Sequence, residues 1–156
     1  MVRLNPTWHK LLDATRWQKE QAQIQLAQAL ARQEKVERQL AQTEAALEQL
    51  DNLLVARQKE GMTIAQMREA TEYARYLQQR MHQDKLALKR AEWQTSRSRE
   101  MVMHHSREEK KWQLLIDKAT RQVLEELRRR EQRELDEVAV LGYQREHLPG
   151  SERFEE

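Results

Sequence analysis

Apolar residues recur along this chain in alternating steps of four and three over two long stretches. In the first stretch these positions extend from Trp8 to Leu54, and ten of the 14 are apolar. In the second stretch they extend from Met67 to Leu127, and 13 of the 18 are apolar. An average spacing of 3.5 residues keeps one narrow stripe against a partner helix and is typical of a left-handed coiled coil. The pattern therefore predicts two long helices with one apolar seam each.

Glycine and proline divide the chain between these helices. Asn5 followed by Pro6 is a favourable helix start, because asparagine caps a free backbone N–H and proline at the first helical position loses no hydrogen bond. Gly61 suits a left-handed helix end, and Thr63 with Gln66 reads as the capping box of a new helix. These signals predict helix one over about 6–60, a turn over about 61–63 and a second helix from about 64.

The second helix is expected to reach about residue 141. Gly142 is interpreted as its stop, and residues 142–156, which include Pro149 and Gly150, as a flexible C-terminal tail. The fold class is therefore all-α: two long helices in an antiparallel coiled-coil hairpin, with helix two longer than helix one. Residues 1–141 form the hairpin domain, and residue i is expected to face roughly residue 123 − i.

Composition supports helices with a thin core and argues against several functions. Hydrophobic residues are 38% and charged residues 35% of the chain, which favours a coiled coil over a thick globular core. Three scattered glycines and no predicted strand exclude a phosphate-binding loop or a strand-borne catalytic triad, so neither an enzyme nor a cofactor is expected. His104 and His105 each have a glutamate four residues on, but one such pair gives too few ligands for a metal. No apolar run is long enough for membrane insertion.

Two surfaces are candidate partner contacts. The segment 75–99 has seven basic and two acidic residues, a net charge of +5, and includes Arg75, Arg80, Lys89 and Arg90. It is either a solvated face or a stripe for an acidic protein surface, with RNA or DNA as a third reading. Trp17 and Trp93 lie two residues off the seam, hence outside it, and are either partner contacts or partly covered by long neighbours.

The end of helix two carries a dense cluster of charges. Residues 121–137 contain five arginines and six acidic residues, a net charge of −1, so no nucleic-acid binding is expected there. The run from Arg129 to Ala139 reads RREQRELDEVA. Together with the hairpin plan, this run resembles the end of helix two in the central stalk family of type III secretion systems, YscO and its flagellar counterpart FliJ.

The resemblance implies a function that composition does not show. It implies a non-enzymatic stalk that binds a hexameric secretion ATPase, in the manner of a rotary-ATPase γ subunit, and links it to the cytosolic domain of the export gate protein. Secretion chaperones are a further implied partner, and the implied location is the cytoplasm, at the inner membrane of a Gram-negative bacterium. The implied ring contact lies on Arg128, Arg129, Arg130, Arg133, Glu134 and Asp136.

A different class of function stays open beside this one. A generic coiled-coil scaffold or a chaperone-type binding module would share the same hairpin, although a prefoldin-like chaperone should also have strands between its helices, and none is predicted near residue 61. The chain is expected to be monomeric when free. Additional leucines beside the seam, such as Leu30 and Leu86, leave self-association as an alternative that light scattering can test.

Overall fold

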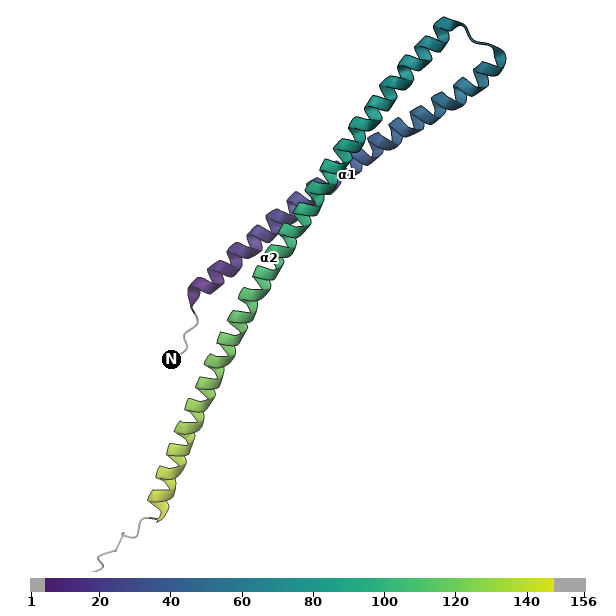
Figure 1. Ribbon diagram of the computed structural model, residues 1–156. Coiled ribbons are helices and arrows are strands. Elements are labelled where there is room, and N and C mark those ends of the chain that lie inside the picture. Colours follow the sequence, from purple (N-terminus) through teal and green to yellow (C-terminus); the bar gives the residue numbers. More distant parts are fainter. Residues whose placement is uncertain (1–4, 148–156) are drawn as a thin grey trace, which may run out of the picture. The chain divides into compact units, whose positions relative to one another are not determined.

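The computed structural model describes residues 5–147, which form two α-helices and one short turn. Helix α1 spans Pro6–Glu60 and α2 spans Ile64–His147. The two helices run antiparallel and pack against each other, joined by the turn (Figure 1). The 84 residues of α2 exceed the 55 of α1. The predicted all-α hairpin with a longer second helix is confirmed.

The start of α1 follows the capping predicted from its sequence. The Thr7 N–H donates to Asn5 Oδ1 over 3.0 Å, and the Trp8 N–H donates to the Asn5 carbonyl over 3.0 Å. Pro6 is the first helical residue, where a missing N–H costs nothing. The cap and the proline therefore place the helix start at the predicted residue.

The turn is built by one glycine and one capping box. Gly61 has φ +94°, the left-handed conformation that L side chains rarely adopt. The Gln66 N–H donates to Thr63 Oγ1 over 3.2 Å, and the Thr63 N–H donates to Gln66 Oε1 over 3.3 Å. Two backbone donors that a helix start leaves free are thus satisfied reciprocally. The predicted turn at 61–63 is confirmed.

The predicted end of α2 is wrong. The helix continues through Gly142 to His147, six residues beyond the expected end at 141. Gly142 does not have a positive φ. Glycine within a helix costs only about 1 kcal/mol relative to alanine, so the helix can continue through it. Tyr143 and His147 support this last turn, since their rings stack at 4.1 Å between centroids. Residues 142–147 are therefore helix, and the remainder of the predicted tail, 148–156, lies outside the described residues.

The two glycines give a matched prediction of opposite sign. Gly61→Ala should lower the melting temperature by roughly 2–4 °C, because alanine at this φ costs about 1 kcal/mol. Gly142→Ala should instead increase helicity, because alanine is the better helix former. A Cβ at either glycine meets no atom within 4 Å, so neither effect includes a steric clash. Circular dichroism at 222 nm during heating measures helicity and melting temperature for both variants. A change in the same direction in Gly61→Ala and Gly142→Ala would contradict the prediction.

Contacts divide the described residues into two units. One comprises residues 14–108, with the turn, and the other comprises residues 5–13 of α1 together with residues 109–147 of α2. Each contains part of the seam. The prediction that residues 1–141 act as one domain stays a prediction.

The seam of unit 14–108 is lined by small side chains. Every predicted seam position in this unit is buried or half-buried except Met67, which is 45% exposed. The fully buried positions are Thr15, Ala22, Ala29, Thr43, Leu77, Thr95 and Ser98. All but one of them are alanine, serine or threonine. Because interaxial distance depends on the side chains at the contact, this composition allows a close approach of the helices.

One hydrogen bond fixes the register in this unit. The Thr43 hydroxyl donates to Asp84 Oδ2 over 2.8 Å, and its oxygen also lies 3.1 Å from the Gln39 carbonyl in the previous turn. The predicted alignment placed Thr43 opposite Arg80, so the observed partner is four residues further, about one helical turn. Polar seam pairs specify alignment because a shifted register leaves them unpaired.

A second threonine on the seam has no such partner. Thr95 is 2% exposed, and its Oγ1 is buried without a hydrogen bond. Thr95→Val should raise the free energy of unfolding by about 1 kcal/mol, because a buried unsatisfied hydroxyl is replaced by a methyl group of the same shape. Thr43→Val should lower it by a similar amount, because a made bond is lost and Asp84 loses its donor. Urea unfolding separates the two, and a loss of stability in Thr95→Val would contradict the expectation.

The other unit has a buried start and a bare end. Leu12, Ile116 and Ala119 are buried in it, and Trp8, Trp112 and Val123 are half-buried. From Leu127 to His147 every described residue is exposed. Since α1 begins at Pro6, no described part of the chain covers this end of α2.

Candidate functional site

The bare end of α2 carries the charged cluster predicted as a ring contact. Arg128, Arg129, Arg130, Arg133, Glu134 and Asp136 are all exposed on this one helix. Gln132 Nε2 donates to Asp136 Oδ1 over 3.0 Å. Large apolar side chains stand among these charges, with Leu135 64% and Val138 67% exposed. A helix with charged and apolar side chains exposed on all sides is suited to contact a protein surface around it.

A shallow hollow lies further along the same helix. It is lined by Arg133, Asp136, Glu137, Val140, Leu141 and Gln144. Sequence reasoning did not name Val140 and Leu141, although the predicted helix included them, because the heptad positions were followed only as far as Leu127. Their exposure extends the candidate contact surface of this unit toward His147.

The basic stripe lies on α2 in unit 14–108. Arg75, Arg80, Lys89 and Arg90 are all exposed there. Arg80 Nη1 donates to the Tyr76 hydroxyl over 3.2 Å, which raises the pKa of the guanidinium, with a smaller contribution from the charge of Asp84.

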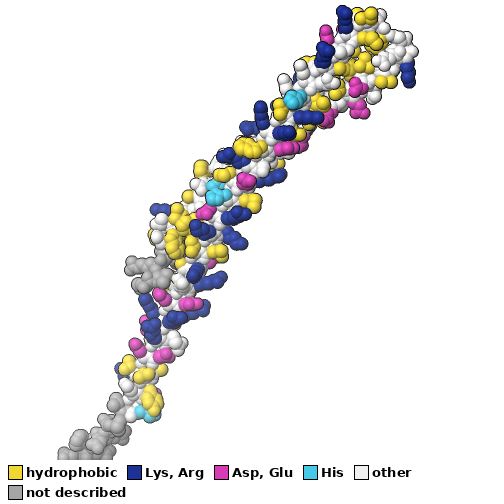
Figure 2. All heavy atoms as spheres, viewed as in Figure 1, with side chains coloured by type: hydrophobic (Ala, Val, Ile, Leu, Met, Phe, Trp, Pro, Cys, Tyr) yellow, Lys and Arg dark blue, Asp and Glu magenta, His cyan; other side chains and the backbone are white. Residues whose placement is uncertain are grey.

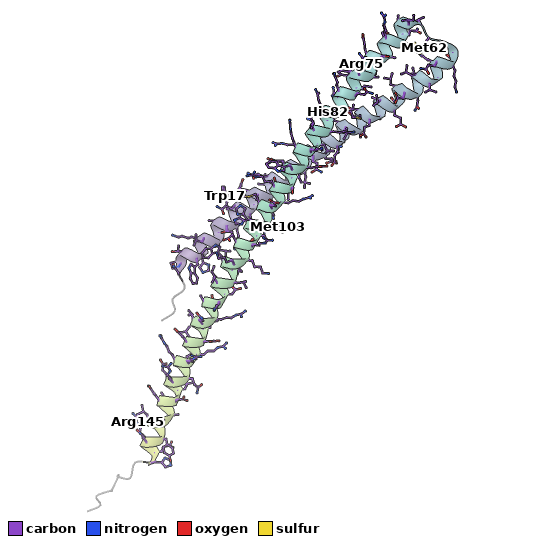
Figure 3. All side chains as sticks on the ribbon, viewed as in Figure 1. Trp17, Met62, Arg75, His82, Met103 and Arg145 are labelled. Atoms are coloured by element: carbon purple, nitrogen blue, oxygen red, sulfur yellow. The ribbon has the colours of Figure 1, made fainter. Side chains whose placement is uncertain are left out.

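A second hollow on the same helix brings Arg75 together with residues that sequence reasoning passed over. Its lining is Arg75, Gln78, Gln79, His82 and Gln83. Arg75 and His82 come from the part of α2 near the turn (Figure 3). His82 stands seven residues after Arg75, and this spacing was the signal that could have identified it.

The two outer tryptophans lie on different helices and have different surroundings. Trp93, on α2, is 59% exposed, and the Arg97 guanidinium lies 5.4 Å from its ring centroid, a cation–π distance. Trp17, on α1, is 62% exposed and borders a hollow that both helices line. The other lining residues of that hollow are Gln18, Gln21, Ala22, Gln25, Met101 and His105. The structure thus leaves both rings accessible but does not place them in one site.

These surfaces combine charged and apolar side chains. Lys and Arg side chains stand out along the helices with hydrophobic side chains between them (Figure 2). Within residues 5–147, no group of three or more His, Asp or Glu side chains is arranged to hold a metal ion. His104 and His105 contact each other edge to face, with ring centroids 5.3 Å apart. Neither described helix contains an apolar stretch sufficient to cross a membrane.

Comparison with known proteins identifies the family. A family model described as the flagellar FliJ protein matches residues 7–148, which is nearly the whole chain. No curated protein and no solved structure matches the chain at a significant level. The match confirms the resemblance to the type III secretion stalk family that the end of helix two suggested.

Proposed function

Because the chain belongs to the flagellar FliJ protein family, we propose that it is the stalk of a type III export apparatus, which binds the hexameric export ATPase and couples it to the export gate. Membership makes it a component of type III protein export. The family consists of non-enzymatic export components, which agrees with a surface that offers charged and apolar contacts. The proposed location is the cytoplasm, at the inner face of the membrane that carries the gate.

The observation that carries this proposal is the bare end of α2. Over residues 127–147 the helix is exposed on every side, and charges of both signs stand near exposed leucine and valine side chains. A partner that surrounds a helix can use all of these side chains, whereas a flat surface would reach only one face. Arg128, Arg129, Arg130, Arg133, Glu134 and Asp136 are the proposed contacts to the ATPase ring.

The remaining candidates serve a second contact in this proposal. Arg75, Arg80, Lys89, Arg90 and Trp93 on α2, with Trp17 on α1, are proposed to face the cytosolic domain of the gate or a secretion chaperone. They lie in unit 14–108, whereas the proposed ATPase contacts lie in the other unit. The two contacts can therefore be altered separately by mutation.

A hydrolysis assay tests the stalk proposal. The purified chain is added in sub-stoichiometric amounts to the cognate export ATPase, and phosphate release is followed. We expect a rate increase of several-fold, because a stalk that promotes ring assembly acts on six subunits at once. An unrelated antiparallel coiled coil of similar length and charge is the control. Absence of both binding and stimulation would refute the proposal.

A further inference from the structure

A second heptad pattern runs along α2 on the side away from the seam. Arg75, His82 and Lys89 are spaced by seven residues. Leu86 and Trp93 are also seven apart, and each follows a basic residue, His82 or Lys89, by four positions. Because seven residues make about two helical turns, these five side chains lie along one face of the unbroken helix. We name this the outer face of α2. All five residues are exposed, including 42% of Leu86 and 59% of Trp93.

The outer face points away from α1. Each of its members precedes a seam position by two residues: Arg75 precedes Leu77, which is 4% exposed, and Trp93 precedes Thr95, which is 2% exposed. Two residues correspond to a rotation of about 200° around a helix. The face is therefore open to a partner without any change in the hairpin.

The charge on the outer face has one sign. Of the two carboxylates between residues 75 and 99, Asp84 lies on the seam and accepts from Thr43. Glu92 lies about a quarter turn from Trp93, beside the face. Arg97, which follows Trp93 by one turn, holds its guanidinium 5.4 Å from the indole centroid and adds a further cation next to the largest apolar side chain.

This pattern selects one kind of occupant. From His82 to Trp93, basic and large apolar side chains alternate every three to four positions, and Gln79 stands between Arg75 and His82. This order matches a helix with the same repeat, whose apolar side chains meet Leu86 and Trp93 and whose carboxylates meet Arg75 and Lys89. From Arg75 to Arg97 this stretch of α2 is roughly 33 Å long, which corresponds to about 22 helical residues in a partner. A lipid surface would require a continuous apolar stripe, and a phosphate backbone would make no use of Leu86.

We propose that the outer face of α2, together with Arg97 beside it, is a docking surface for an acidic amphipathic helix of a partner protein. The proposal deepens the stalk function and rests on it for the existence of that partner. It adds the chemical class of the segment that binds and the residues that read it. Leu86 and Trp93 are the apolar anchors, and Arg75, Lys89 and Arg97 pair with carboxylates.

A binding assay with a defined probe tests this surface. The probe is a synthetic, fluorescently labelled helical peptide of about 24 residues with leucine at the seam positions of each heptad and glutamate at the flanking ones. We expect it to bind the full chain, as measured by fluorescence anisotropy, and to bind more weakly as salt increases. The same peptide with lysine in place of glutamate should not bind.

Substitutions on the face have matched controls elsewhere. Trp93→Ala and Lys89→Glu should each weaken peptide binding by about tenfold or more, because tryptophan and charge reversal have the largest effects at interfaces. Leu86→Ala should weaken it by a smaller factor, whereas Leu30→Ala on α1, with 41% exposure against 42%, should leave it unchanged. Lys59→Glu near the turn is the matched charge control.

The outcomes separate this proposal from the stalk function. A wild-type chain that fails to bind the acidic peptide overturns the docking surface, and so does equal loss in Leu30→Ala and Leu86→Ala. Tighter binding to single-stranded DNA or to anionic vesicles than to the peptide also overturns it. Leu86→Ala should still stimulate the export ATPase, because Leu86 is not among the proposed contacts of the stalk. If the wild-type chain fails to stimulate the ATPase but binds the peptide, the stalk function fails and the docking surface stands.

Discussion

Reversal of three charges on the bare end of α2 should weaken binding to the export ATPase by about tenfold or more. The variant carries Arg128→Glu, Arg129→Glu and Arg133→Glu together. All three side chains are exposed, so the substitutions remove no buried contact and should leave the hairpin folded. Arginine is enriched among residues that dominate binding energy, and like charges placed against a complementary surface are repelled. Stimulation of ATP hydrolysis at sub-stoichiometric amounts measures the effect.

A charge-matched control shows whether position or net charge matters. Arg57→Glu, Lys59→Glu and Arg68→Glu change the net charge by the same amount on exposed positions beside the turn. This control should stimulate the ATPase as the wild type does. If both triple variants lose stimulation equally, the effect is one of bulk charge and the assignment of the contact to 128–136 is wrong. Unchanged stimulation by the first variant would also contradict the assignment.

A carboxylate at Ala29 should lower the free energy of unfolding by about 3 kcal/mol or more. Ala29 is 4% exposed on the seam of unit 14–108, where small side chains line both helices. Ala29→Glu puts a longer, ionised side chain at this position, and burial of an unpaired charge costs several kcal/mol. For a chain of this length the loss corresponds to a decrease of roughly 6–12 °C in melting temperature.

Ala31 provides the control two residues away. It is exposed on the same helix, and Ala31→Glu should change stability by no more than about 0.5 kcal/mol. Lowering the pH should reduce the difference in free energy of unfolding between Ala29→Glu and Ala31→Glu. Burial raises the pKa of the carboxyl group introduced by Ala29→Glu above its value of about 4.3 in the unfolded chain, so the deficit is full at pH 7 and decreases as protonation neutralises the group. Thermal unfolding at pH 7 and near pH 4 measures the stability of both variants. Equal losses of stability in Ala29→Glu and Ala31→Glu would show that Ala29 is not buried in the seam.

The ends of most elements were predictable because each depends on a few neighbouring residues. Asn5 and Pro6 start α1, and Gly61 with Thr63 and Gln66 makes the turn, through hydrogen bonds that span two or three positions. The end of α2 was not predictable in this way. Gly142 can either terminate a helix or continue it at a cost of about 1 kcal/mol, so the residue type alone does not decide between them.

The candidate site was predictable in part. The positions of Trp17 and Trp93 outside the seam follow from the heptad repeat, but the sequence left open whether long neighbours cover them; both rings are exposed. His82 was not named, and the position of the Arg97 guanidinium over the Trp93 ring was not foreseen, because the rotamer of a long side chain is not fixed by its place in the repeat. Val140 and Leu141 were missed because the heptad positions were followed only as far as Leu127, although the predicted helix included both residues.

The sequence alone determined that this chain forms two helices, where they turn, and which stripe of each is buried. Those properties follow from capping residues and from a 3.5-residue repeat, both of which act over short distances along the chain. Only the tertiary structure decided which turn of α1 meets which turn of α2, because the Thr43 to Asp84 hydrogen bond joins residues 41 positions apart. It also decided that the hydroxyl of Thr95 is buried without a hydrogen-bond partner, since that depends on what the opposite helix supplies at that level.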